Sequence, residues 1–178
     1  MPILESDNFY LRKISLEDCN ENYLGWMNDS EINQYLESRF ITHTIDSLKN
    51  FVSSMNSSEN NILFAIIDKE SDKHIGNIKL GGIHPVHKYA DIGLVIGDKN
   101  YWGRGIATNA ISLVCKYAFD DLNLRKVFAG VYENNIGSIK AFKKCGFKKA
   151  YIKKDTYFFK GDFIDAFVFE LYNKNLVD

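Results

Sequence analysis

A glycine-rich loop at residues 101–108 has the residue types and spacing of an anion-binding site. Gly103 and Gly105 stand between a segment typical of a strand, 89–97, and a segment with helical periodicity. Such a junction presents unpaired backbone N–H groups and the positive end of a helix dipole, and glycine lets an anion approach the backbone closely. The loop therefore predicts a phosphate or pyrophosphate site, with an ordinary tight turn as the alternative.

Two familiar phosphate-binding loops do not match this sequence. A Walker loop needs Gly-Lys-Ser/Thr, whereas Gly105 is followed by Ile106 and Ala107. A dinucleotide-binding loop needs a third small residue where Thr108 stands, and it opens an early parallel strand–helix–strand unit. The order of elements described below excludes that arrangement.

The charge of the chain is distributed unevenly. The net charge is −1, but residues 101–160 hold 12 Lys and Arg against 4 Asp and Glu, whereas residues 1–100 hold 9 against 15. This pattern predicts an anionic ligand near the later segment, and a solvated lysine-rich face is the alternative. The paired lysines are not interleaved with an RNA-binding aromatic signature, so we expect no nucleic-acid partner.

Composition places the chain among globular proteins, with 46% hydrophobic and 25% charged residues in a length of 178. That length is sufficient for one domain, which we expect over residues 1–178, with a core that needs no disulfides. The chain has three cysteines, Cys19, Cys115 and Cys145, which are widely spaced and not set at metal-ligand spacing. We expect them to be reduced thiols. With no apolar run long enough for a signal or a membrane span, we expect a cytoplasmic protein without a metal or a membrane partner.

Hydrophobic periodicity indicates an α+β chain whose elements must position the loop. Strands alternate apolar and polar residues, helices repeat apolar residues every three or four positions, and glycine and polar clusters separate them. The expected order begins with a strand at 8–14, a helix opened by Ser15 and Asp18 and running toward Asn28, and a helix from 44–46 onward. Strands follow at 62–68, 74–83 and 89–97. The last part has a helix after Gly103, a strand at 126–131, a short helix capped by Asn135, and two final strands that turn near Lys160.

Taken together, these segments resemble the GNAT N-acetyltransferases, and specifically their RimJ/RimL branch. The resemblance covers nearly the whole chain. It is carried by Ala90–Gly97, Tyr101–Ile111, Asn135–Ser138 and Phe142–Phe147, with weaker support from Trp26–Asp29, Tyr35–Leu36 and Gly161–Asp165. It implies a mixed, mostly antiparallel sheet of about seven strands with about four helices, splayed between the fourth and fifth strands.

The resemblance also implies acetyl-CoA as the acetyl donor, bound in that splay. Pantetheine would pair with the backbone of the fourth strand, pyrophosphate would lie on the N–H groups of the glycine loop, and Lys140, Lys143 and Lys144 would reach the CoA phosphates. The residues assigned to the cofactor in this way are Leu94, Val95, Ile96, Trp102, Gly103, Arg104, Gly105, Ile106, Ala107, Thr108, Asn135, Ser138, Phe142, Lys143 and Lys144.

Two positions depart from the family pattern. Trp102 stands where the family has a basic or amide residue, which removes one polar contact and leaves the backbone N–H groups. Phe142 stands where family members often have a tyrosine that protonates the departing thiolate. The acid role is therefore expected to pass to Ser138, to another group or to water.

Acetyl transfer to nitrogen requires an uncharged amine, although a lysine-like amine has a pKa of about 10.4 and is mostly protonated at pH 7. The resemblance favours Asp91 as the proton acceptor, directly or through water, and a structural charge at the strand end is the alternative. His84 and His87 flank Pro85 just before it and are either further candidates or ordinary surface histidines.

The acceptor is expected to be a small-molecule amine. Its candidate contacts are Trp26, Asp29, Glu31, Tyr35, Arg39, His84 and His87. The basic residues at 84–88 and Arg39 favour an amino sugar or a nucleotide-linked amino sugar, whereas the acids would favour a polyamine, and N-terminal peptides of ribosomal proteins are a third class within the branch. A module that holds CoA without turnover is the rival from another class, and we expect a monomer or a homodimer.

Overall fold

The computed structural model describes residues 3–174 and 176 and shows a mixed sheet with helices on both faces. Within the described residues, eight strands lie in the order β1-β2-β3-β4-β5-β6-β8-β7, and the parallel pair is β5 with β6. The strands are β1 (Leu4–Glu5), β2 (Phe9–Lys13), β3 (Ile62–Asp68), β4 (His74–His84), β5 (Tyr89–Ile96), β6 (Lys126–Tyr132), β7 (Lys148–Phe159) and β8 (Asp162–Tyr172). This confirms the expected fold class.

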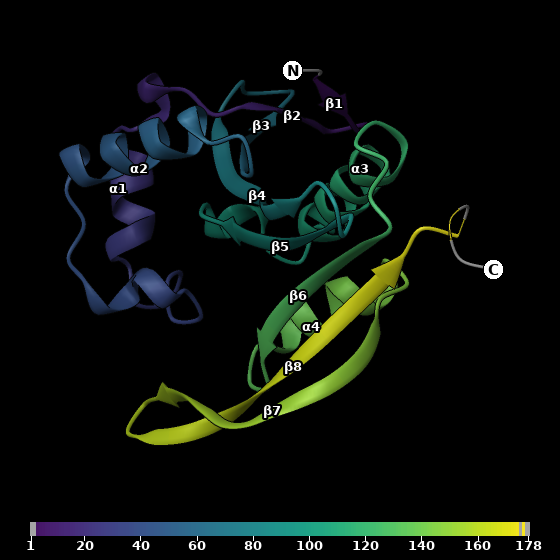
Figure 1. Cartoon of the computed structure of the whole chain (residues 1–178). Coiled ribbons are helices and arrows are strands. Elements are labelled where there is room, and N and C mark those ends of the chain that lie inside the picture. Colours follow the sequence, from purple (N-terminus) through teal and green to yellow (C-terminus); the bar gives the residue numbers. More distant parts are fainter. Residues whose placement is uncertain (1–2, 175, 177–178) are drawn as a thin grey trace.

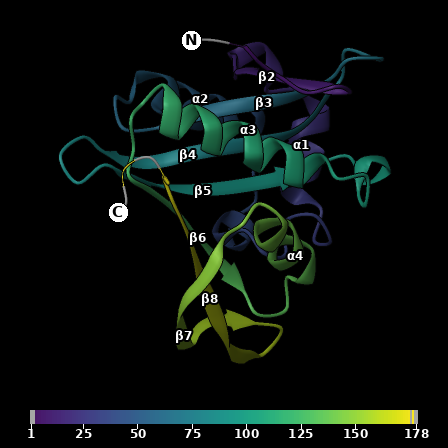
Figure 2. The ribbon, with the colours of Figure 1, turned by 90° about the vertical axis from the view of Figure 1, so that its right-hand side faces the viewer.

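Four α-helices within the described residues cover the sheet: α1 (Glu21–Asn28), α2 (Ile45–Ser57), α3 (Ile106–Asp120) and α4 (Ile136–Lys144). Figures 1 and 2 show α1 and α2 on one face of β2–β5, α3 on the other face, and α4 beside β6 and β8. Strand β3 packs alternate side chains into both cores, with Phe64 and Ile66 toward α3 and Leu63 and Ala65 toward α1 and α2. Its nearly continuous apolar sequence follows from this burial on both faces.

The sheet splits between β5 and β6. These strands pair only over Tyr89–Asp91 and Lys126–Phe128, after which β6 continues against β8 alone. Beyond Asp91, β5 therefore presents a free edge, and Figures 1 and 2 show β6, β8 and β7 swinging away from it. The expected splay is present. It divides the sheet into a first limb, β1–β5, and a second limb, β6–β8.

The N-terminal region differs from its expected form. Ser15 and Asp18 open only a short 3-10 turn, Leu16–Asp18, and α1 begins separately at Glu21, where the Asn20 side chain accepts from the N–H groups of Asn22 and Tyr23. The expected capping box is present, since the Asp18 carboxylate accepts from the Ser15 N–H at 2.7 Å. The same carboxylate also accepts two hydrogen bonds from Arg12 on β2, at 2.7 and 2.6 Å. The two-residue β1 was not expected, because its sequence is too short for a periodic pattern.

Within the described residues, none of the helices combines the length and apolarity needed to cross a membrane.

Candidate active site

The glycine loop has the conformation of an anion-binding turn. Gly103 and Gly105 have φ angles of +74° and +78°, in the left-handed region that favours glycine, and no described atom lies within 4 Å of a Cβ built on either. Helix α3 begins at the next residue, Ile106, and its first turn carries no acidic side chain. The amides of that turn have no intrahelical acceptor, so the turn offers several N–H donors with open space in front of them.

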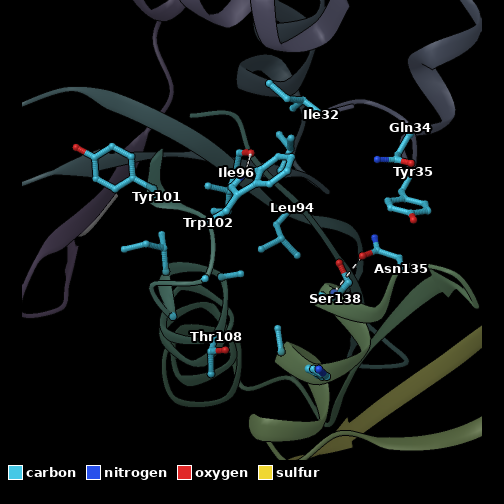
Figure 3. A pocket seen from close by; sticks show the side chains of 18 of the residues that line it. Ile32, Gln34, Tyr35, Leu94, Ile96, Tyr101, Trp102, Thr108, Asn135 and Ser138 are labelled. Atoms are coloured by element: carbon cyan, nitrogen blue, oxygen red, sulfur yellow. Dashed lines mark hydrogen bonds between the residues drawn. The ribbon is translucent and has the colours of Figure 1, made fainter. Parts of the chain in front are cut away.

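A second helix begins on the opposite side of the splay. Asn135 caps α4 and accepts a hydrogen bond from the Ser138 N–H at 3.1 Å. This contact fixes the first turn of α4, and Figure 3 shows Asn135 and Ser138 facing Leu94 across a cavity. Lys140 and Lys144, further along α4, also line that cavity and supply positive charge.

The cavity has a volume of about 480 Å³ and runs through the splay. Its walls come from four segments: the free edge of β5, the glycine loop with the start of α3, the start of α4, and the connection between α1 and α2. The residues that line it are Glu31, Ile32, Gln34, Tyr35, Leu36, Leu94, Val95, Ile96, Tyr101, Trp102, Gly103, Gly105, Ile106, Ala107, Thr108, Asn135, Gly137, Ser138, Lys140, Ala141 and Lys144.

Residues 29–41 of the α1–α2 connection cross the splay and are here called the strap. Near its start, Asp29 and Glu31 both contact Lys99, in the turn that follows β5 of the first limb, with O to Nζ distances of 2.8 and 2.6 Å. Lys99 lowers the pKa of Asp29, and the two acids raise the pKa of Lys99. Near its end, Arg39 donates to the Phe158 carbonyl of the second limb at 2.7 Å. The strap is thus fixed to both limbs.

Aromatic contacts and a buried polar group hold the middle of the strap. Tyr35 stacks on Phe159, with ring centroids 5.4 Å apart, and its hydroxyl donates to the Asn134 carbonyl at 3.0 Å. The Tyr132 hydroxyl donates to Glu37 and accepts from Arg39. Burial, and then the hydrogen bond to Glu37, raise the pKa of Tyr132 to about 12, although Arg39 opposes the shift. Tyr132 therefore stays neutral at physiological pH and serves as an anchor.

Asp91 lies where β5 and β6 part, but it is outside the cavity wall. Its carboxylate contacts Lys79 Nζ at 3.8 Å and is about one-third exposed. Side chains alternate along a strand, so Asp91 shares a face with Gly93 and with Val95, which does line the cavity. No described atom lies within 4 Å of a Cβ built on Gly93, so the space between Asp91 and Val95 is open.

Other expected site residues also lie away from the cavity. Phe142 is 2% exposed and packs on Phe147 and Phe169, because its face of α4 covers the sheet. His84 and His87 stack on each other in the β4–β5 hairpin, with centroids 4.2 Å apart. The remaining residues in this group are Trp26, which is buried; Asp29 and Arg39, which are used as strap anchors; Lys143; and Arg104, which faces the back of the glycine loop.

Trp102 has a contact that its position in the sequence did not indicate. Its Nε1 donates to the Ile96 carbonyl at 2.8 Å, and Figure 3 shows the indole lying along the end of β5. One carbonyl of the free edge is therefore already in use. Six wall residues were not predicted from the sequence, although several adjoin a predicted site residue: Ile32, Gln34, Leu36, Tyr101, Gly137 and Ala141.

Cys145 is held in place by hydrogen bonds. Its Sγ contacts the Thr108 carbonyl at 3.2 Å and Ser112 Oγ at 3.4 Å, and burial raises its pKa. A thiol with these contacts packs α3 against α4 and is not activated as a nucleophile. Among residues 3–174 and 176, no group of three or more His, Cys, Asp and Glu side chains is arranged to hold a metal ion.

Comparison with known proteins identifies the family. The family model for the acetyltransferase (GNAT) domain matches residues 8–148. The chain belongs to this family. It is 32% identical over 174 residues to the Bacillus licheniformis protein named as an uncharacterized N-acetyltransferase, p20, covering 96% of each chain. The GNAT assignment makes the protein an N-acetyltransferase with acetyl-CoA as its donor, and confirms the resemblance at the level of the family.

Solved structures share the fold at lower identity. A spermidine N-acetyltransferase from Vibrio cholerae in complex with CoA and spermine gives a TM-score of 0.85 at 21% identity, covering 94% of this chain and 96% of that one. RimJ from Mycobacterium smegmatis in complex with CoA-disulfide gives 0.81 at 18% identity, covering 96% and 84%. At these identities the likeness concerns the fold.

Proposed function

We propose that this GNAT enzyme acetylates the primary amine of a small molecule by direct attack on acetyl-CoA in a ternary complex. The observation that carries the proposal is the cavity, which passes through the splay from the glycine loop to the strap. Donor and acceptor can enter such a passage from opposite sides and meet at the free edge of β5. A thioester is already activated, so direct attack requires no enzyme nucleophile.

On the donor side, the pyrophosphate would lie on the amides of Gly103–Thr108, with Lys140 and Lys144 near the phosphates. Pantetheine would extend along the free edge of β5. Because the Trp102 side chain already donates to the Ile96 carbonyl, the pantetheine amides would pair with the backbone groups around Leu94. The open space beside Gly103 and Gly105 supports this placement, since any Cβ there would enter the site.

At the reacting centre, the amine must lose a proton and the departing thiolate must gain one. Asp91 would accept the amine proton through water, because Asp91 lies outside the wall and the open space beside Gly93 separates it from the cavity. Ser138 lines the cavity at the start of α4, and its hydroxyl would donate to the thiolate. Phe142 is buried in the core and takes no part.

On the acceptor side, the charge of the wall distinguishes the candidate amines. Among the strap residues in the wall, Glu31 carries a negative charge that its contact with Lys99 partly offsets, whereas the basic candidates Arg39, His84 and His87 lie outside the wall. We therefore infer a small cationic amine of the polyamine type, and the fold of the spermidine acetyltransferase supports this choice. The sequence favoured an amino sugar because of the basic residues Arg39, His84 and His87. These residues do not line the cavity, so they no longer support that acceptor.

Three further points are part of the proposal. Residues 1–178 would act as one domain of the RimJ/RimL branch, which the motifs of the sequence support. The described cysteines are free, as in a cytoplasmic protein. The enzyme acts as a monomer or a homodimer.

A screen of acceptors tests the proposal. Thiol release from acetyl-CoA is measured over polyamines, amino sugars, nucleotide-linked amino sugars and N-terminal peptides, and products are identified by mass. We expect turnover with a polyamine, and Glu31→Gln should raise its KM several-fold without changing the KM for acetyl-CoA. Turnover of amino sugars alone would reject the acceptor class. Binding of CoA without turnover of any amine would favour a non-catalytic module.

A further inference from the structure

A second hollow lies directly behind the glycine loop. It has a volume of about 360 Å³ and is lined by Asp7, Asn8, Asp68, Lys69, Glu70, Tyr101, Arg104 and Ile106. Tyr101 and Ile106 also line the main cavity, so they form the partition between the two spaces. In Figure 3, Tyr101 lies at the edge of the main cavity with its hydroxyl directed away from Leu94.

A chain of contacts joins this partition to the turn between β3 and β4. The Arg104 guanidinium lies over the Tyr101 ring, 5.4 Å from its centroid. The Tyr101 hydroxyl is 3.5 Å from Ser71 Oγ. Ser71 donates twice to Asp68 Oδ2, from Oγ at 2.5 Å and from its backbone N–H at 3.0 Å. The chain therefore ends on a carboxylate that is only 9% exposed, at the end of β3.

The electrostatics of this chain favour an ionised Asp68. Hydrogen bonds from Ser71 lower its pKa, and the Tyr101 hydroxyl and the Arg104 guanidinium lower it further, although burial opposes the shift. Arg104 contributes through its charge and its position over the Tyr101 ring, and it lines the second hollow and not the main cavity. Its position between two glycines makes this anchoring important, because glycine is the residue with the most backbone freedom to lose on ordering.

We propose that Asp68 and Tyr101 are positioning residues for the acetyl donor: together with Ser71 and Arg104 they form a brace that fixes the glycine loop from behind. The brace holds the amides of the loop toward the main cavity before the donor arrives, which reduces the ordering cost of binding. This proposal rests on the proposed placement of the donor on the loop. It assigns Arg104 to the brace, whereas the sequence assigned it to the cofactor.

The test measures the affinity of the intact protein for CoA by calorimetry, together with steady-state kinetics. Asp68→Asn is expected to raise both the Kd for CoA and the KM for acetyl-CoA about tenfold, with kcat unchanged at saturation. Tyr101→Phe, which removes one oxygen, should act in the same direction and keeps the test open if Asp68→Asn fails to fold. A Kd within twofold of wild type in a folded variant of either kind would overturn the brace.

The matched control is Asp72→Asn in the same turn. Asp72 accepts from the Tyr10 hydroxyl at 2.8 Å, away from the loop, and its φ of +54° is one that asparagine tolerates. This variant should bind CoA as wild type does. An equal loss in Asp72→Asn would make the effect a general one of the turn and reject the proposal.

A double-mutant cycle separates the two roles of Arg104. If Arg104 acts through the brace, Arg104→Met combined with Asp68→Asn should bind CoA no more weakly than the weaker single variant. Losses that add would mean that Arg104 contacts the donor directly, against the proposal. Gly105→Glu distinguishes failure of the donor placement from failure of the brace. If Gly105→Glu binds CoA normally, the placement of the donor on the loop is wrong, whatever the brace variants do.

Discussion

The proposed donor side and the proposed acceptor side of the cavity are built in different ways. The donor side consists of two short contiguous segments, the glycine loop before α3 and the start of α4, whose shapes depend on glycine φ angles and on the Asn135 cap. The acceptor side is the strap, which depends on contacts between residues about a hundred positions apart, such as Tyr35 with Asn134. Local sequence thus fixes the donor side, whereas the acceptor side exists only in the folded chain.

This difference predicts how each side responds to substitution. Damage to a local segment should act on donor binding and leave the fold intact, because the segment depends on its own backbone. Damage to the strap should act on the acceptor and spread to both limbs of the sheet, because Lys99 and Phe158 lie on different limbs. Four substitutions test the comparison, and they follow in order of decreasing effect.

Gly105→Glu should abolish binding of CoA, because it places a carboxylate where the pyrophosphate would lie and forces a residue other than glycine to a φ of +78°. Calorimetry measures the loss, and circular dichroism checks the fold. Gly25→Ala in α1, where the added methyl group also meets open space, is the control and should bind normally. Unchanged affinity in Gly105→Glu would remove the donor from this loop.

Asp91→Asn should lower kcat by about 10²-fold or more, as expected for loss of a general base, with the Kd for CoA unchanged. The loss should be greatest at low pH, where free amine is scarce. A pH–rate profile from pH 6 to 9 checks this. Wild-type rates across that range would limit Asp91 to its contact with Lys79. Asp98→Asn, at the other end of β5, is the control.

Ser138→Ala should lower kcat about threefold to tenfold, less than loss of the base, because a thiol pKa near 8.5 makes the thiolate a good leaving group without full protonation. Steady-state kinetics should show the loss in kcat and not in the affinity for CoA. Phe142→Tyr should not compensate, since Phe142 packs in the core and not on the cavity wall. An unaffected kcat in Ser138→Ala would leave protonation to water.

Tyr35→Phe should raise the KM for the amine about threefold, because the variant keeps the stacking on Phe159 and loses one hydrogen bond to the Asn134 carbonyl. The KM for acetyl-CoA should be unchanged, because the strap is proposed to contact the acceptor and not the donor. Tyr151→Phe, on the exposed strand β7, is the matched control. A change in the KM for acetyl-CoA instead would show that the strap serves the donor.

The sequence predicted most elements of the fold and the glycine loop that lines the cavity, because these depend on signals within a few residues. Alternating apolar residues marked β3, and the glycine loop marked the start of α3. The capping box at Ser15 and Asp18 formed as expected, but it opens a 3-10 turn, and a second cap at Asn20 begins α1 separately. Arg104 and Phe142 lie in well-matched motifs and yet face away from the cavity, since a motif does not specify which way each side chain points.

By itself, the sequence determined the α+β class, the order of most elements and the glycine-rich junction before α3, which follow from periodicity, backbone freedom and capping. The acetyltransferase family was indicated by the resemblance of its motifs. Only the tertiary structure decided which side chains share the cavity. It assigned Glu31 and Tyr35 to the wall, Asp29 and Arg39 to the strap anchors, and His84 to a distant hairpin. The physical reason is that side-chain direction is set by packing between segments far apart in the chain, which short-range patterns cannot record.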